Sequence, residues 1–90
     1  MENNERVARW KVTLELSDVE GHSHARATLD TGAATSLSAV GTARLSPHDS
    51  YDVPEVGYEL AAGRALAALA AELMRTASDD IAGISELERG

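Results

Sequence analysis

Apolar and polar residues alternate along two segments near the start of the chain, a pattern typical of β-strands with one buried face. From residue 10 to 17 the apolar parity holds Trp10, Val12, Leu14 and Leu16. A polar turn segment follows at 18–22, and residues 24–30 then carry small apolar residues at odd positions. The pattern predicts a β-hairpin whose inward row includes Trp10 as a core anchor.

A third alternating segment covers residues 37–45, after a second loop at 30–35. Its inward parity holds Leu37, Ala39, Gly41, Ala43 and Leu45. Small side chains at these positions leave room for an element that packs closely across the sheet. We therefore expect a helix to cover this face.

The second half of the chain has helical periodicity. After a polar connector at 46–52, Pro54 and Glu55 favour a helix start, and the apolar spacing of three and four continues to about residue 77. Leu66 lies on the broad apolar face and is predicted to be a core residue. A helix over 55–77 is about 34 Å long at about 1.5 Å per residue, so part of it extends beyond the sheet. Ser78 favours a new cap and a short second helix through Ile84 and Leu87.

These elements predict one α+β domain over residues 1–90, with a core at about 9–84 and flexible polar ends. The predicted order is β-β-β-α: a three-stranded antiparallel sheet, one long helix packed on one face, and a short C-terminal helix.

Charge and composition narrow the function classes. The 90 residues include 15 Asp and Glu against 8 Lys and Arg, a formal charge of -7, with no Cys and no Phe. Without Cys there is no disulfide framework, and a core poor in aromatic residues favours a homodimer through the edge of the third strand, the Ala-rich part of the helix, or both. A single Lys argues against coating of duplex nucleic acid. We expect a cytoplasmic protein without a membrane segment.

Asp30, Thr31 and Gly32 follow the second strand, and a strand followed by Asp-Thr-Gly is also the signature of dimeric retroviral-type aspartic proteases. Those enzymes are nearly all β and carry a Gly-rich flap, whereas the second half of this chain is helical. Asp and Gly are also ordinary turn residues. The sequence therefore predicts a turn at Asp30 and a protein that is not an enzyme.

His22 and His24 lie close to Asp18 and Glu20, a set that offers two imidazoles and a carboxylate to a divalent metal. Two histidines at one turn without a third ligand elsewhere are more typical of solvated hairpin residues. The sequence predicts no cofactor and no metal, and leaves open whether this cluster ever binds a metal ion.

Four cations share the outward parity of the strands: Arg9, Lys11, Arg26 and Arg44. If Leu14 faces Ala27, then the hairpin register sets Glu15 against Arg26 and Lys11 against Asp30; a two-residue slip would set Glu15 against His24 and Arg9 against Asp30. Carboxylates meet cations in either register. We expect any contact with RNA or a ribosome to use these four residues, with weak or no binding of naked duplex RNA.

Two segments carry a family resemblance: Val40-Gly41-Thr42-Ala43-Arg44-Leu45-Ser46-Pro47, and Val53-Pro54-Glu55-Val56-Gly57-Tyr58-Glu59-Leu60-Ala61-Ala62-Gly63-Arg64-Ala65-Leu66. With the preceding strands, the chain resembles, over about residues 10–84, a small actinobacterial family of uncharacterised proteins described as having a double-stranded-RNA-binding-domain-like fold. Some members are linked to dormancy or hypoxia, and one has been compared in shape with dimeric ribosome-hibernation factors. The resemblance implies a stress- or dormancy-associated interaction protein that acts at the ribosome or another RNA–protein assembly. The alternative is a small homodimeric adaptor that binds proteins without contact to nucleic acid.

Overall fold

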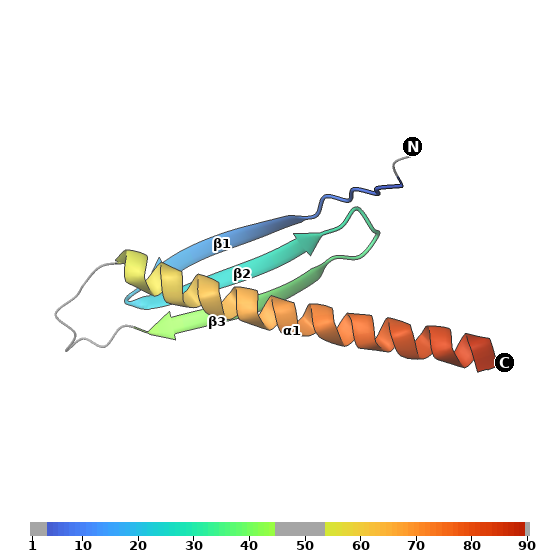
Figure 1. Ribbon diagram of the computed structural model, residues 1–90. Coiled ribbons are helices and arrows are strands. Elements are labelled where there is room, and N and C mark those ends of the chain that lie inside the picture. Colours follow the sequence, from blue (N-terminus) through green and yellow to red (C-terminus); the bar gives the residue numbers. More distant parts are fainter. Residues whose placement is uncertain (1–3, 45–53, 90) are drawn as a thin grey trace.

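Three strands precede one helix in the computed structural model, which describes residues 4–44 and 54–89. The strands are β1 (Lys11–Val19), β2 (His22–Asp30) and β3 (Leu37–Arg44), and the helix is α1 (Pro54–Arg89) (Figure 1). The strands are antiparallel and lie in chain order. This confirms the predicted α+β fold. The predicted connector at 46–52 lies outside the described residues.

The hairpin between β1 and β2 is tight. Glu20 and Gly21 form its two-residue turn, with φ of 49° and 79°, and the strands extend to it on both sides. Positive φ at both turn positions matches the twist of the flanking strands. Leu14 pairs with Ala27, so the first of the two predicted registers is confirmed and the two-residue slip is wrong.

Helix α1 covers one face of the sheet through a narrow row of small side chains. Its buried positions recur every four residues: Gly57, Ala61, Ala65 and Leu69. They pack against the inward row of β2 and β3, where Ala25, Ala27, Leu29 and Ala43 are buried. The predicted inward parity of β2 and β3 is confirmed for the described residues. Small residues on both sides let the helix approach the sheet closely.

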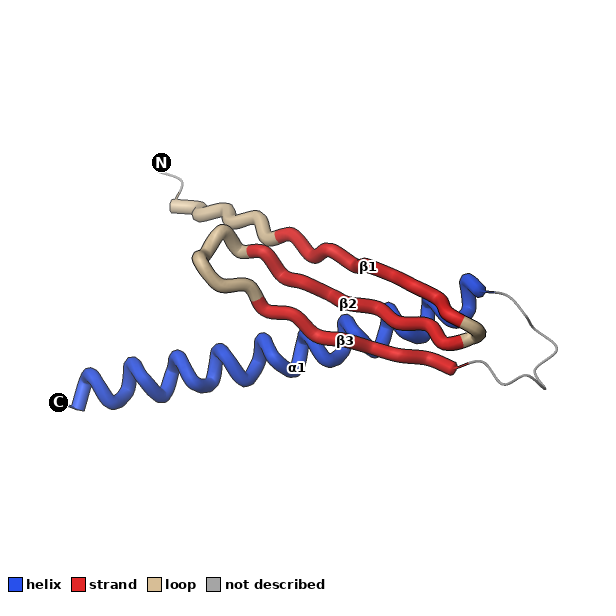
Figure 2. Tube along the Cα trace, turned by 180° about the vertical axis from the view of Figure 1, so that it is seen from behind, coloured by secondary structure: helices blue, strands red, loops and turns tan. Residues whose placement is uncertain are grey.

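The helix crosses the sheet obliquely (Figures 1 and 2). Its first turns lie near the β1–β2 turn, and its last turns extend past the start of β3 (Figure 1). Every residue from Ala77 to Arg89 is exposed. The radius of gyration is 18.5 Å, whereas a compact chain of this length has about 12 Å. The end of α1 from Ala77 to Arg89 is therefore an overhang that extends beyond the sheet.

Two predicted core residues are not in the core, and both predictions are wrong. Trp10 is 55% exposed and Leu66 is 41% exposed. Trp10 has the predicted parity, since Val12, two residues later, pairs with the buried Leu29. However, the row of α1 that faces the sheet is too narrow to extend over β1, and every residue of β1 is exposed.

The predicted break at Ser78 is also wrong, because α1 continues without interruption to Arg89. Ser78 and Asp79 are good capping residues, but their side chains are exposed here and can be solvated within a continuous helix. No proline follows Pro54, so nothing forces the helix to end.

Candidate functional site

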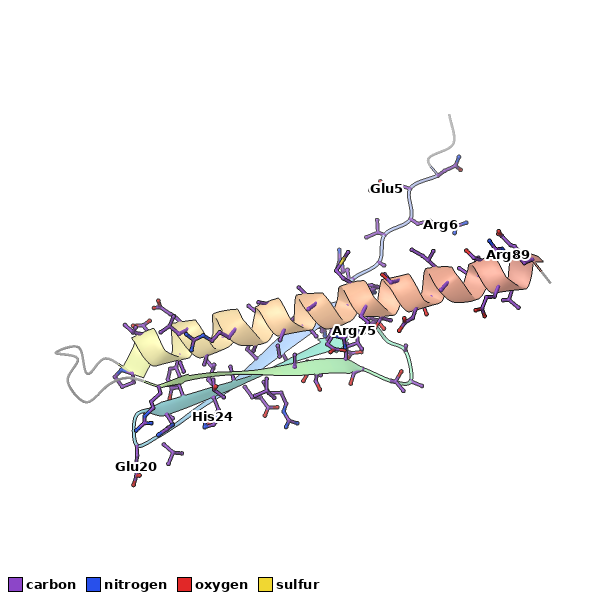
Figure 3. All side chains as sticks on the ribbon, turned by 90° about the horizontal axis from the view of Figure 1, so that it is seen from below. Glu5, Arg6, Glu20, His24, Arg75 and Arg89 are labelled. Atoms are coloured by element: carbon purple, nitrogen blue, oxygen red, sulfur yellow. The ribbon has the colours of Figure 1, made fainter. Side chains whose placement is uncertain are left out.

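The face of the sheet opposite α1 carries most of the side chains that the sequence singled out. In Figure 3, His24 points away from the helix, on the open side of the sheet. We call this surface the open face. It consists of Lys11, Thr13, Glu15, Ser17, Val19, His22, His24, Arg26, Thr28, Asp30, Ser38, Val40, Thr42 and Arg44, which alternate with the inward rows.

The cations of the open face are spread along its length. Lys11 pairs with Asp30, Arg26 pairs with Glu15, and Arg44 pairs with His22. Each of these pairs belongs to one row across the sheet. Neighbouring rows are four residues apart along the strands, which is about 13 Å at about 3.3 Å per residue. Two of the three cations thus have a carboxylate directly across the strand pair. The result is a patchwork of opposite charges rather than one basic patch.

Arg9 lies before β1 and is exposed. The structure therefore gathers three of the four predicted contact residues on the open face, in separate rows, and leaves Arg9 outside the sheet.

A hollow lies at the middle of the open face, around Arg26. Its lining includes Glu15, Ser17, His24, Arg26 and Val40. This set offers a guanidinium, a carboxylate, a hydroxyl and an imidazole around one apolar side chain. Such a surface can exchange hydrogen bonds and ion pairs with side chains of a protein partner.

The histidines and Asp18 lie on opposite faces of the sheet. Asp18 pairs with Ser23, which is buried beneath α1, whereas His22 and His24 belong to the open face. Within residues 4–44 and 54–89, no three His, Asp or Glu side chains lie close enough together to hold a metal ion.

Asp30 takes part in the turn that follows β2. The Gly32 N–H donates a 2.8 Å hydrogen bond to Asp30 Oδ1, and the Ala33 N–H donates a 3.4 Å bond to Thr31 Oγ1. Gly32 has a φ of 87°, a conformation that favours glycine. The predicted turn is confirmed.

Sequence reasoning missed an apolar surface on the other face, beside α1. It consists of Trp10, which directly precedes β1, Val12, Leu14 and Leu16 of β1, and Leu66 and Leu73 of α1. We call this surface the wedge. The four β1-side residues are 38–55% exposed, and β1 and α1 diverge toward the N-terminal end of the strand (Figure 1).

One hydrogen bond shows which flank of α1 faces the wedge. Arg64 Nη1 donates a 2.7 Å bond to the carbonyl oxygen of Thr42, so Arg64 lies on the β3 side of the helix. Leu66 is two residues later, about 200° around the helix, and therefore lies on the β1 side. Leu73, two turns further, packs against the core from the same flank. A helix row of glycine and alanine beside a strand of large side chains was the signal that could have predicted this gap.

None of the helices in the described part of the chain is both long and apolar enough to cross a membrane.

Comparison with known proteins agrees with this architecture. Residues 8–88 match the family described as Rv2632c-like. Uncharacterized protein Mb1767 of Mycobacterium bovis is 34% identical over 79 residues, 88% of this chain and 82% of that protein, and Uncharacterized protein MT1780 of Mycobacterium tuberculosis matches equally. The crystal structure of Rv2632c superimposes with a TM-score of 0.80 at 31% identity, over 90% of this chain and 94% of that one. The predicted membership of a family with uncharacterised actinobacterial members is confirmed, and the chain belongs to the Rv2632c-like family.

Proposed function

We propose that this chain is a non-enzymatic interaction protein that binds a protein partner through the open face. The observation that carries the proposal is the pairing of Lys11 with Asp30 and of Arg26 with Glu15 across neighbouring strands. A protein partner whose charges have the opposite order can form ion pairs with the open face at several positions at once. The alternating charges attract a polyanion such as RNA weakly, because each nearby carboxylate repels phosphate.

Apolar positions within the open face support a protein partner as well. Val19 and Val40 are 63% and 54% exposed there. Val40 pairs with Arg26, so an apolar contact and a guanidinium lie in the same row. Arginine beside apolar side chains is typical of protein interfaces, where the aliphatic stem packs and the head group forms hydrogen bonds.

The non-enzymatic part of the proposal draws support from Asp30. Its carboxylate accepts a hydrogen bond from the backbone of its own turn and faces Lys11 across the strand pair. In this position the carboxylate stabilises the turn. A pair of aspartates that share a proton, as in an aspartic protease, is not needed to explain why Asp30 lies here.

A second candidate, contact with a ribosome or another RNA–protein assembly, is favoured by one end of the open face. Arg44 faces His22 there, and His24 and Arg26 follow on β2. This end carries more cationic and imidazole groups than the rest of the sheet. The stress or dormancy role implied by the family resemblance belongs to this candidate. The protein would then contact the ribosome or another RNA–protein assembly in non-growing cells.

Retention of partners on immobilised protein tests both candidates. We compare the parent, R26E/R44E on the open face, and R75E/R89E on α1, which changes the net charge equally but leaves the open face intact. Each is incubated with extract of stationary-phase cells at 50 mM and 200 mM salt, with and without ribonuclease, and ribosome fractions are run on a gradient.

We expect the parent and R75E/R89E to retain the same protein, resistant to ribonuclease, and R26E/R44E to lose it. Loss on ribonuclease treatment, with binding that falls steeply between roughly 50 and 200 mM salt, would favour the ribosome candidate. Equal retention by all three proteins would overturn a role for the open face.

A further inference from the structure

Two neighbouring hollows at the open face share Glu15 in their linings and otherwise differ in chemistry. We propose that together they bind one amphipathic helix of a protein partner. An acidic side chain of that helix enters the first hollow, and a basic side chain seven or eight residues away enters the second. This inference rests on the proposed function and adds the shape and the charge pattern of the segment that the open face binds.

The first hollow, around Arg26, offers hydrogen-bond donors. They are the Arg26 guanidinium, the His24 imidazole and the Ser17 hydroxyl. Glu15 faces Arg26 across the strand pair, yet among the described side chains no ion pair joins the two. The guanidinium therefore has donors left for a partner. Its planar shape allows two parallel hydrogen bonds to a carboxylate.

The second hollow lies further along β2 and offers hydrogen-bond acceptors. Its polar lining consists of two carboxylates and three hydroxyls, from Glu15, Asp30, Thr13, Thr28 and Ser36. Asp30 accepts a bond from the Gly32 N–H through one oxygen and retains further lone pairs. Lys11 faces Asp30 across the strands, but within residues 4–44 and 54–89 it forms no ion pair with it. The acceptors are therefore available to the ammonium group of a partner's lysine.

A helix fits this surface better than an extended segment does. The open face presents side chains, because the backbone groups of β2 already pair with β1 and β3. An extended segment on this face would leave its own N–H and C=O groups without partners, whereas a helix bonds them internally. Three strands about 4.8 Å apart are about 10 Å wide, close to the diameter of a helix. Helix α1 already packs on the opposite face of the same sheet (Figure 2).

The separation of the hollows determines the spacing of the two charges on the bound helix. Arg26 and Asp30 are four residues apart on β2, about 13 Å at about 3.3 Å per residue. Helical residues seven or eight apart lie on one face, about 10.5–12 Å from each other. The flexible stems of a glutamate and a lysine cover the remaining distance. Val40, which lines the first hollow and is 54% exposed, offers an apolar contact to a residue one turn from the acid.

A partner of one charge sign fits the two hollows less well. Phosphates would meet Arg26 in the first hollow but would be repelled by Glu15 and Asp30 in the second. A uniformly basic segment would be repelled by Arg26. Charge complementarity at both hollows therefore requires one acid and one base.

Selection from a displayed peptide library tests this pattern. The library is one helical scaffold randomised on a single face, and it is selected in parallel on the full-length parent, on R26E and on R75E. R75E is the matched control, since it changes the net charge equally at an exposed position of α1. We expect the parent and R75E to enrich peptides with an acid and a base seven or eight residues apart. R26E should enrich a base in place of the acid, because a carboxylate then replaces the guanidinium.

Fluorescence anisotropy with one enriched peptide tests the second hollow. D30N removes the charge of Asp30, and its amide oxygen can still accept the bond from the Gly32 N–H. We expect D30N to weaken binding about two- to fivefold, as is typical of an exposed ion pair. The same substitution should have no effect on a peptide whose lysine has been changed to methionine.

Several results would overturn the inference. They are the absence of enrichment on the parent, the same enriched peptides on R26E as on the parent, and a loss with D30N that persists for the methionine peptide. Tighter binding of a single-stranded RNA oligonucleotide than of any enriched peptide, at roughly 200 mM salt, would also overturn it. Peptides that need Arg26 but lack the acid and base spacing would overturn the inference and leave the proposed function in place. The retention experiment described above decides the proposed function separately.

Discussion

Gly41 of β3 lies directly beneath Ala61 of α1. A Cβ atom at position 41 would meet the Ala61 carbonyl oxygen and the Ala65 backbone nitrogen, and would lie 2.8 Å from the Arg64 carbonyl carbon. All three neighbours are backbone atoms of one helix, which cannot move aside as a side-chain tip can. The separation of helix and sheet is therefore set by this one residue.

We expect Gly41→Ala to destabilise the fold by about 1–3 kcal/mol, since the helix must lift from the sheet and loosen the alanine contacts on both sides. Urea unfolding measures the change. The matched control is Gly63→Ala, where nothing lies within 4 Å of the added carbon. Because alanine is the better helix former, that variant should gain about 0.5–1 kcal/mol. Equal effects of the two substitutions would contradict the close contact.

Two leucines three residues apart on α1 should differ sharply. Leu69 is 5% exposed and belongs to the core, whereas Leu66 is 41% exposed in the wedge. Leu69→Ala should cost about 2–5 kcal/mol and Leu66→Ala less than about 1 kcal/mol. Thermal unfolding followed by circular dichroism distinguishes them. If Leu66→Ala were as costly as Leu69→Ala, the orientation of α1 would be wrong.

Removal of the Arg64 guanidinium should weaken the link between α1 and the edge of β3. Arg64→Met keeps an apolar stem but loses the donor to the Thr42 carbonyl, at an expected cost of about 1 kcal/mol. Light scattering during heating should also show earlier aggregation, because the strand edge becomes accessible.

Arg75→Met is the control for this experiment. It removes an exposed ion pair with Glu72, 2.7 Å long, within the helix. Such pairs contribute at most about 0.5 kcal/mol. A loss as large as that of Arg64→Met would show that the bond to β3 has no special role.

Asp30→Asn should leave both the fold and the oligomeric state unchanged, because the amide oxygen can accept the same bond from the Gly32 N–H. Asp30→Ala loses the acceptor and should cost about 0.5–1 kcal/mol. Chemical denaturation of the three proteins checks this order. Peptide cleavage at acid pH that pepstatin blocks, present in the parent and absent from Asp30→Asn, would contradict the non-enzymatic proposal.

Strand parity could be predicted from the sequence because it depends on local alternation. Alternation left two registers of the hairpin open, because a two-residue slip preserves parity, and the two-residue turn at Glu20 and Gly21 fixes the observed one. Once Leu14 faces Ala27, the period of two fixes the remaining partners, including Glu15 with Arg26 and Lys11 with Asp30. The open face followed from the same rule. The turn at Asp30 followed from the chemistry of Asp and Gly.

Burial of β1 could not be predicted, because it depends on where the helix crosses the sheet. Trp10 has the inward parity but is 55% exposed, because α1 does not cover it. The alternation of residues predicts which face of the sheet a side chain lies on. It does not predict how much of that face the helix covers. The wedge remained hidden for the same reason. The continuity of α1 past Ser78 was missed because capping propensity is a weak signal in an exposed helix.

The chain-order topology of the sheet has a consequence for the path of folding. Each strand pairs with its immediate predecessor, so the β1–β2 hairpin, closed by Glu20 and Gly21, needs no residue after Asp30. Hairpins form in about 1–10 μs, far faster than a ribosome adds residues, so this hairpin can form before α1 is synthesised. The inward row of this hairpin is then exposed until another element packs against it. The β2 half is covered once α1 has been synthesised, whereas the residues of β1 stay exposed in the finished chain.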